Sequence, residues 1–341
     1  MAKKTTVPSA DNFLKVGIIT SGGDSPGMNT AIYTIARHCL YFGFQPFVVY
    51  EGYRGLVQNN IHPINILEAE AHSSHGGTYI YTSRLPEFKQ LKVRQQAVKN
   101  LKARGINTLV IVGGDGSYQG AKALSEMGIN CICLPGTIDN DIGSSDFTIG
   151  FHTALDSIDR ATDQIVETCV SHKRVALIEV MGRYCGDLAL YSGLTSGADL
   201  IITSENYISD REIANKVKTY FTKHPQSRAY VIIVTERMYG HNGNPTLEEV
   251  AQKILKATGY KTNINRLGYL QRGGRPSTMD RVLAIRMGMH AVELIAQNKK
   301  NRVVGICRDK IVDYSIAHGL KMVNPKRIDM VEKINKIQEK V

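Results

Sequence analysis

The strongest constraint on the fold is a repeated pattern of short, β-branched segments that end in glycine or polar residues and alternate with helical segments. In the first half these are VGIIT, PFVVYEG, TLVIVGGDG and CICLPGTIDND (16–20, 46–52, 108–116 and 131–141). In the second half they are VALIEVMG, LIITSE, YVIIVTE and RLGYLQRGG (175–182, 200–205, 230–236 and 266–274). Alternating β and α segments predict parallel sheets covered by helices on both faces. We therefore expect an α/β fold of two doubly wound, Rossmann-like parallel-sheet domains with a cleft between them.

Chain length supports two domains, because 341 residues exceed the roughly 100–200 residues typical of one. We place a boundary near Gly150, where a helical pattern over 150–172 would carry the chain from one half to the other. The six cysteines lie mostly in apolar segments without metal-binding spacing, so we expect them to be reduced core residues.

The net charge of the chain and its distribution limit the classes of molecule that it is expected to bind. Lys and Arg exceed Asp and Glu by 42 − 31 = 11, and residues 298–341 hold 11 basic and 5 acidic residues spaced like a solvated helix face. A positive chain attracts phosphorylated metabolites by long-range steering. Without tryptophan, an aromatic RNA-binding motif or a zinc finger, we expect no nucleic-acid partner. No apolar run reaches the roughly 18–20 residues of a membrane span, and the N-terminus lacks an apolar stretch, so we expect a cytoplasmic protein without a membrane partner.

Glycine-rich loops follow two of the predicted strands. In TSGGDSPGMN (20–29), Gly22 and Gly23 would let the backbone approach an anion at a helix N-terminus; a tight βα turn is the alternative. In VGGDGSYQG (112–120), Asp115 would repel a dinucleotide pyrophosphate. Mg²⁺ instead prefers one or two carboxylates with water and phosphates. This loop therefore favours a magnesium nucleotide over NAD.

PGTIDND (135–141) places Asp139 and Asp141 two residues apart beyond a strand, with Thr137 nearby. A carboxylate pair beside a magnesium phosphate is what phosphoryl transfer to an alcohol requires, because one carboxylate accepts the hydroxyl proton. The alternative is a polar turn that only caps the next helix. The segment alone does not decide between them.

Charged side chains follow the second-half strands. Arg183 in MGRYCGD would offset charge on a transferring phosphoryl group. Arg272 in QRGGRPS and Arg174 in SHKR suit a sugar phosphate, and Glu236 could accept a sugar hydroxyl. Singly, each arginine could be an ordinary solvated side chain.

Together these segments resemble the bacterial ATP-dependent 6-phosphofructokinase family. The likeness runs in order from about Lys15 to about Gly305 through TSGGDSPGMN, EGYRGL, GGTYIYTSR, GGDGSYQGA, PGTIDNDI, EVMGRYCGD, TE and LGYLQRGG. The resemblance implies transfer of a phosphoryl group from ATP to the C1 hydroxyl of fructose 6-phosphate in glycolysis.

The resemblance also implies residue roles. The catalytic residues would be Asp139 as proton acceptor, with Arg183, Thr137 and Asp141. ATP would be bound by Gly23, Arg84, Leu85, Gly114, Asp115, Gly116 and Ser117, with Asp115 at the Mg²⁺. Fructose 6-phosphate would be bound by Thr137, Ile138, Asp139, Arg174, Met181, Gly182, Arg183, Glu236, Asn263, Tyr269 and Arg272.

The same resemblance implies the assembly and the domains. Arg174 would reach the sugar phosphate from a neighbouring subunit, which implies a homotetramer with shared active sites. We expect residues 1–149 plus about 270–320 to bind ATP and Mg²⁺, and residues 150–269 plus about 321–341 to bind fructose 6-phosphate. Pyrophosphate-dependent relatives carry Asp and Lys at the positions of Gly116 and Gly136, so we expect ATP as the donor.

The chain departs from the family pattern at several positions. Asn263 stands where the family has an arginine on the sugar phosphate, and Tyr269 where it has a histidine, so we expect weak or altered sugar-phosphate binding. Where the family gathers cations for ADP or phosphoenolpyruvate, the arginines are replaced by Tyr33, Ile66 and Val166. We expect little response to these effectors. Two alternatives remain: a non-catalytic or regulatory paralogue, and a kinase for another sugar phosphate.

Overall fold

The computed structural model describes residues 13–324 and 327–338, and these form two compact units. Unit 1 comprises the chain through Thr137, with Ile142–Gly150 and Arg275–Val323. Unit 2 comprises Ile138–Asp141, Phe151–Gly274 and the chain from Asn324 onward. Each unit is thus built from segments far apart in the sequence. Which ligand each unit binds stays a prediction.

Unit 1 is a seven-stranded sheet with the order β11-β10-β5-β4-β1-β2-β3. Its strands are β1 (Lys15–Ser21), β2 (Gln45–Val49), β3 (Ile61–Pro63), β4 (Ile106–Gly113), β5 (Asn130–Pro135), β10 (Arg302–Cys307) and β11 (Lys310–Ser315). The inner strands are parallel, as expected, whereas the edge strands β3 and β11 are antiparallel to their neighbours, which the sequence pattern did not predict. β11 follows β10 after only Arg308 and Asp309, and so short a connection permits only antiparallel pairing, whereas the connection from β2 to β3 contains the helix Gly52–Gln58.

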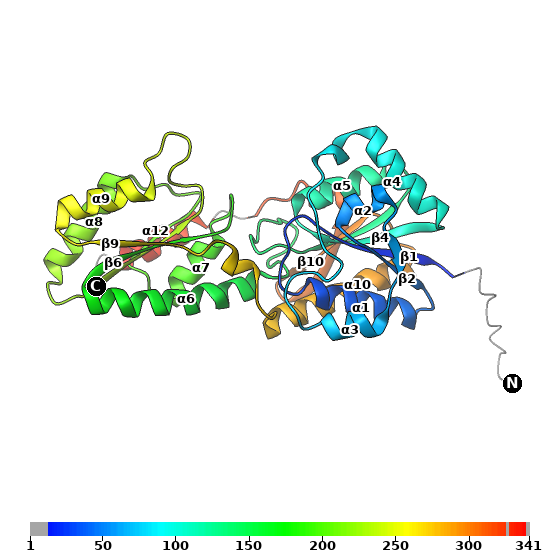
Figure 1. The fold of residues 1–341 in the computed structure, drawn as a ribbon, viewed down its shortest axis with the longest axis horizontal. Helices are drawn as coiled ribbons and strands as arrows, with labels where there is room; N and C mark the ends of the chain where they lie inside the picture. Colours follow the sequence, from blue (N-terminus) through cyan, green and yellow to red (C-terminus); the bar gives the residue numbers. More distant parts are fainter. Residues whose placement is uncertain (1–12, 325–326, 339–341) are drawn as a thin grey trace. The chain divides into compact units, whose positions relative to one another are not determined.

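Helices cover both faces of this sheet (Figure 1). One face carries α1 (Met28–Tyr41), α3 (Ile66–His72) and α10 (Thr278–Ala296). The other carries α2 (Gly52–Gln58), α4 (Leu91–Ala103) and α5 (Asp115–Ser125), and α11 (Ile316–Gly319) and a 3₁₀ turn at Pro86–Lys89 pack into the same core. In β1, Ile18 packs in the first core and Ile19 in the second. A strand buried on both faces has to be apolar throughout, which explains the continuous apolar runs in the sequence.

Unit 2 has a parallel four-stranded sheet with the order β7-β8-β6-β9. The strands are β6 (Arg174–Val180), β7 (Leu200–Ile202), β8 (Ala229–Thr235) and β9 (Thr262–Arg266). The helices are α6 (Phe151–His172), α7 (Asp187–Thr195), α8 (Asp210–Lys223), α9 (Leu247–Thr258) and α12 (Ile328–Gln338). Helices α8 and α9 cover one face of the sheet, and α6 and α7 cover the other (Figure 1). The α/β class, the parallel sheets and the helix expected over 150–172 are confirmed.

One predicted strand is wrong. RLGYLQRGG does not continue as a strand, because β9 ends at Arg266 and Gly268–Arg272 forms a 3₁₀ turn. Gly268 has a φ of 49° and Gly274 a φ of 91°, values that an extended strand does not contain. The side chain of Gln271 turns back to donate to the Gly268 carbonyl at 3.1 Å.

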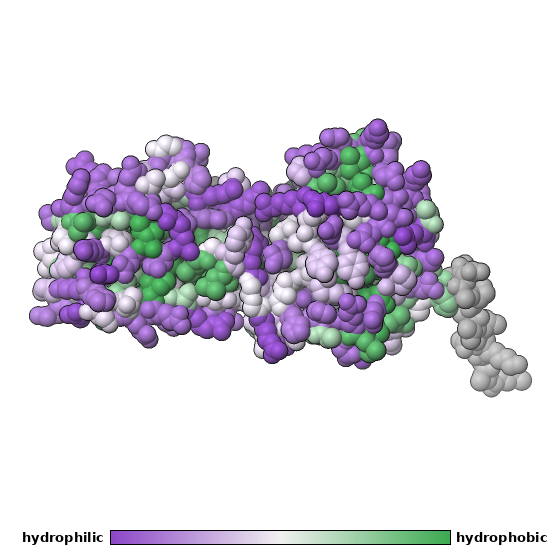
Figure 2. Space-filling view, in the orientation of Figure 1, coloured by the Kyte–Doolittle hydropathy of each residue, from purple (hydrophilic) through white to green (hydrophobic). Residues whose placement is uncertain are grey.

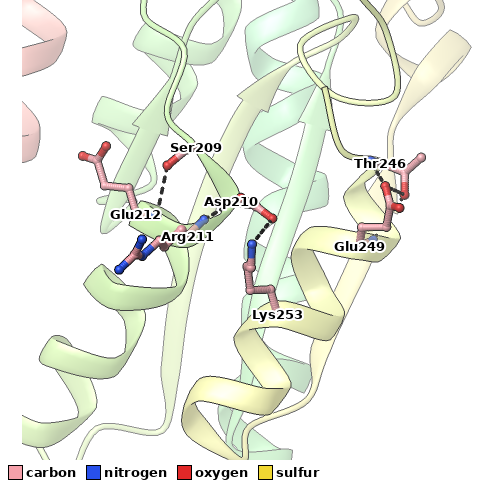
Figure 3. A network of polar contacts seen from close by, with 7 residues as sticks. All are labelled: Ser209, Asp210, Arg211, Glu212, Thr246, Glu249 and Lys253. Carbon is pink, nitrogen blue, oxygen red and sulfur yellow. Dashed lines mark hydrogen bonds and ion pairs between the residues drawn. The ribbon is translucent and has the colours of Figure 1, made fainter. Parts of the chain in front are cut away.

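Polar contacts fix the starts of α8 and α9 (Figure 3). Ser209 caps α8, and Asp210 in its first turn pairs with Lys253 of α9 at 2.6 Å. Thr246 and Glu249 form a reciprocal capping box at the start of α9. Side chains that satisfy the free N–H groups of a first turn typically stabilise a helix by about 1 kcal/mol.

The described surface is mostly polar. The face in Figure 2 is largely hydrophilic, with smaller hydrophobic groups among the charged side chains. Within residues 13–324 and 327–338, no helix is both long enough and apolar enough to cross a membrane. All six cysteines are free and five are buried, in agreement with the prediction. The N-terminal stretch used to predict localisation lies in residues 1–12, outside the described residues.

Candidate active site

Three neighbouring strands of unit 1 end together. In the parallel register Ser21 lies opposite Gly113, and Gly113 lies opposite Pro135. The loops that follow β1, β4 and β5 therefore leave the same edge of the sheet. These loops carry most of the residues predicted to bind ATP, and ligands of doubly wound sheets bind at such an edge.

The loop after β1 leads into α1 through glycines in unusual conformations. Gly22 has a φ of 94° and Gly27, the residue before α1, a φ of 102°. A Cβ atom on Gly27 would lie 2.7 Å from Cγ2 of Ile149, so a side chain there would collide. Gly23 lies between these two glycines and is partly exposed. The loop thus presents backbone at the start of a helix, as the sequence analysis expected.

The loop after β4 opens α5. Asp115 is the first residue of α5 and is exposed, whereas Ser117 is buried and donates its hydroxyl to the Ser21 carbonyl at 2.9 Å. A Cβ atom on Gly116 would meet nothing within 4 Å. The backbone at Gly116 therefore faces open space beside the Asp115 carboxylate.

Tyr53 supports this loop, a role that the sequence analysis missed. Its hydroxyl donates to the Ser117 carbonyl at 2.6 Å, and its ring stacks on Phe88 with centroids 4.3 Å apart. Arg84 is exposed in the loop before Phe88, and Leu85 packs against the same core as Tyr53. The motif EGYRGL was the available signal for Tyr53.

The side-chain set at this edge suits Mg²⁺ rather than a metal held by protein alone. In the described part of the chain, no cluster of three or more His, Cys, Asp or Glu side chains could hold a metal ion. Asp115 supplies one exposed carboxylate beside open backbone. Mg²⁺ keeps several waters and takes its other ligands from substrate phosphates, so one carboxylate fits this ion.

Unit 2 gathers a second set of predicted residues at the carboxyl edge of its own sheet. Val180 lies opposite Thr235 in the register, so Met181–Arg183 after β6 and Glu236 after β8 leave the same edge. The Arg183 N–H donates to Oε1 of Glu236 at 3.2 Å, and the Met181 N–H donates to Oε1 of Gln271 at 2.9 Å. Gln271 is fully buried, and the sequence analysis did not single it out. These bonds tie three loops into one edge.

Arg183 occupies a conformation that few non-glycine residues adopt. Its φ is 57°, after Gly182 at 126°. Its guanidinium lies 5.3 Å from the centroid of the Tyr184 ring, and that of Arg237 lies 5.6 Å from the same centroid. Arg237 also donates to the Tyr184 hydroxyl at 3.3 Å. Strained backbone of this kind persists where surrounding contacts hold it and is frequent at functional sites.

The segment Ile138–Asp141 also belongs to unit 2. Asp139 is only 7% exposed, and Asn140 lies between the two candidate carboxylates with a φ of 54°. The Asn140 side chain donates to Oδ2 of Asp187 at 2.8 Å, and its carbonyl accepts from the Cys185 thiol at 3.7 Å. The carboxylate pair therefore lies against the turn that also carries Arg183.

Two predicted residues lie elsewhere. Arg174 begins β6, and its Nη1 donates to Oδ1 of Asn263 at 3.3 Å. Because β6 has seven residues, Arg174 is about 20 Å from the carboxyl edge of the sheet, and Asn263, opposite Ala176, is about 13 Å from it. The structure therefore does not bring Arg174 to Arg183 within one chain. On the 3₁₀ turn after β9, Arg272 is half-buried and Tyr269 is 85% exposed.

Comparisons with known proteins identify the family of the chain. The family model described as phosphofructokinase matches residues 15–295. The ATP-dependent 6-phosphofructokinase of Photobacterium profundum is 43% identical over 324 residues, 95% of this chain and 99% of that protein. The one of Mesomycoplasma hyopneumoniae (strain J) is 43% identical over 325 residues, again 95% of this chain and 99% of that protein.

Solved structures give the same result. The phosphofructokinase of Pichia pastoris is 33% identical with a TM-score of 0.85 over 99% of this chain, which covers 38% of that longer chain. A pyrophosphate-dependent phosphofructokinase of Nitrosospira multiformis, 19% identical with a TM-score of 0.83 over 95% of this chain and 91% of that one, shares the fold. With the family model matching most of its length, the chain belongs to the phosphofructokinase family.

Proposed function

We propose that this chain transfers the γ-phosphoryl group of ATP to the C1 hydroxyl of fructose 6-phosphate, giving fructose 1,6-bisphosphate and ADP in glycolysis. The observation that carries this proposal is the buried Asp139, on a segment that lies against the turn carrying Arg183. The named relatives are ATP-dependent 6-phosphofructokinases at 43% identity.

Asp139 accepts the proton of the C1 hydroxyl as that oxygen attacks phosphorus. A base with this role needs to lie within hydrogen-bond reach of the hydroxyl, and burial keeps water from competing for it. Asp141 and Thr137 orient the sugar and the phosphates around it. Arg183 offsets the negative charge that spreads over the transferred phosphoryl oxygens.

The nucleotide is held by Gly23, Arg84, Leu85 and Gly114–Ser117. Asp115 would hold a Mg²⁺ ion, and such an ion would supply neutralisation of the negative charge on the nucleotide phosphates. The open space at Gly116 supports ATP as the donor, since a side chain there would project beside the phosphate loop. At Gly136 a Cβ atom would lie 2.7 Å from Cγ1 of Val112, so that glycine is also needed for packing.

Fructose 6-phosphate is held by Ile138, Met181, Gly182, Glu236, Tyr269 and Arg272 with the catalytic residues. Arg174 and Asn263 lie toward the other edge of the same sheet, about 20 Å and about 13 Å away. This separation supports a homotetramer in which they serve the site of a neighbouring subunit in the cytoplasm.

A second candidate function rests on Asn263 and Tyr269. Asn263 gives up a charged contact that an arginine would make, and the Tyr269 side chain is largely in solvent. These features suit a kinase for a different sugar phosphate or a regulatory paralogue with weak sugar binding.

The test is the initial rate of ADP formation from MgATP over a wide fructose 6-phosphate titration, with Asp139→Asn as the blank. Saturable, sugar-dependent turnover that the variant loses supports the proposal. If only another sugar phosphate supports turnover, the second candidate replaces it. No turnover with any sugar phosphate assigns the chain to the regulatory class.

A further inference from the structure

The segment Ile138–Asp141 carries both candidate carboxylates yet lies outside any helix or strand. Its centre, Asn140, is fully buried and has a φ of 54°. A left-handed conformation is tolerated better by Asn than by most residues, but it still needs contacts to hold it. The position of Asp139 and Asp141 therefore depends on what contacts Asn140.

Two of these contacts come from the segment around Asn324 and Arg327. The Asn324 amide donates to the Asn140 carbonyl, which also accepts from Cys185. The Asn140 amide donates to Oδ2 of Asp187, and the same oxygen accepts from Nη1 of Arg327. The backbone and the side chain of Asn140 are thus both tied, directly or through one carboxylate, to residues late in the chain.

Arg327 is itself firmly placed. Asp187 is only 4% exposed, and a buried carboxylate needs a paired cation. Burial lowers the pKa of Arg327, but the charge and hydrogen bond of Asp187 more than reverse this, so the net pKa is raised. The Arg327 guanidinium also lies 5.6 Å from the centroid of the Tyr191 ring. An ion pair and an aromatic contact together fix the direction of its side chain.

We propose that Asn324 and Arg327 are positioning residues for phosphoryl transfer, holding Asp139 and Asp141 in place through Asn140. Neither residue touches the reacting atoms. The inference rests on the proposed function, because the effect expected of these contacts is an effect on the rate of phosphoryl transfer. A base that is displaced by about 1 Å can cost 100-fold in rate, so contacts behind the segment matter to turnover.

The kinetic test compares Asn324→Ala, Arg327→Gln and their combination with wild type. We expect the combined variant to lower kcat by about 10–100-fold. The KM for MgATP should stay within about twofold, because Gly114–Ser117 belong to unit 1. Lys333→Gln removes one positive charge from the exposed side of α12 and is the matched control, with kcat expected within about twofold of wild type. An unchanged kcat in the combined variant overturns the proposal.

A second comparison separates positioning from general structural damage. In the Asp139→Asn background the combined variant should lower the residual rate by a clearly smaller factor than in wild type, because the proton acceptor is already gone and only the placement of Asp141 can still be lost. An equal loss in both backgrounds overturns the proposal. Arg327→Gln leaves the charge of Asp187 without its cation and risks unfolding. Asn324→Ala leaves no charge without its partner, so this single variant can replace the combined one in both comparisons. For it we expect kcat to fall about 5–10-fold.

Hydrogen exchange tests the contact independently of activity. The amides of Ile138–Asp141 should exchange at least about tenfold faster in the combined variant and at the wild-type rate in Lys333→Gln. Unchanged exchange overturns the proposal. If wild type shows no fructose 6-phosphate-dependent turnover, the proposed function fails, while hydrogen exchange still decides whether this segment is held from Asn324 and Arg327.

Discussion

Asp139 is the single side chain on which the proposed chemistry depends most. It is nearly buried and lies next to Asn140, whose contacts fix the segment. Asp139→Asn keeps the size and removes the proton acceptor, so we expect kcat to fall about 10²–10⁴-fold. Steady-state rates at saturating MgATP measure this, with thermal unfolding as the control for folding. A variant that turns over at the wild-type rate removes Asp139 from the mechanism.

Asn263 is the residue at which the sequence departs most clearly from its family. It accepts a hydrogen bond from Arg174 and contacts the Cys169 sulfur, so it is already engaged in polar contacts. If this pair serves a sugar phosphate, Asn263→Arg adds a charge-assisted contact. We then expect half-saturation at an about tenfold lower fructose 6-phosphate concentration. Asn263→Gln is the control. If Asn263→Arg leaves the half-saturating fructose 6-phosphate concentration unchanged, position 263 takes no part in substrate binding.

Among the secondary-structure elements, the short strand β7 is completed by a side chain from a helix. β7 is an edge strand of three residues, and Asn335 of α12 replaces its missing neighbour. The Asn335 amide oxygen accepts from the Ile201 N–H at 2.9 Å, and its nitrogen donates to the Ile201 carbonyl at 2.8 Å. A side chain thus covers both polar groups of an edge, the part of a sheet most open to false pairing.

Asn335→Ala should therefore destabilise unit 2. The change leaves two backbone groups of Ile201 without their partner, and we expect the free energy of unfolding to fall by about 1–3 kcal/mol. Urea denaturation measures the loss. Lys333→Ala on the exposed side of α12 serves as the control. If both variants unfold at the same urea concentration, α12 does not complete the sheet.

At this scale the sequence predicted the buried strands well, because a strand covered on both faces has to be apolar along its length. β3 and β11 were missed because little of either edge strand is buried, and β10 was missed although its residues 303–306 are buried. The glycine turn of Asp115 and the residues after β6 and β8 were found because they follow buried strands. Tyr184, Asn324 and Arg327 were not, because their contacts join residues up to 184 positions apart that no local pattern records.

At the scale of the whole molecule, the Asp199 carboxyl is one source of a pH-dependent stability. Burial raises the pKa of Asp199 to about 6, although its bonds from the Val231 and Asp199 N–H groups and the nearby His224 act in the opposite direction. The folded pKa lies above the unfolded one, so folding favours the protonated acid. This contribution is present below about pH 4 and is lost as the pH rises through about 6.

Asp199→Asn should remove that dependence. Asn keeps an acceptor for the Val231 N–H, which Asp199 now accepts at 2.7 Å, but carries no charge. We expect the variant to gain stability relative to wild type at pH 7.5 but not at pH 4.5. Urea denaturation at both pH values measures the difference. If the difference in the free energy of unfolding between variant and wild type is the same at both pH values, Asp199 is not the group whose titration changes stability.

The discontinuous make-up of unit 1 has a consequence for biosynthesis. β10 pairs with β5, and α10 packs with α1 in one core, yet both late elements belong to Arg275–Val323. A ribosome that has released Gly150 still has more than half of the chain to add. At about 5–20 residues per second this takes roughly ten to forty seconds. During that interval the growing chain presents β5 as an open edge and α1 without its packing partner, so chaperone cover on the nascent chain matters most there.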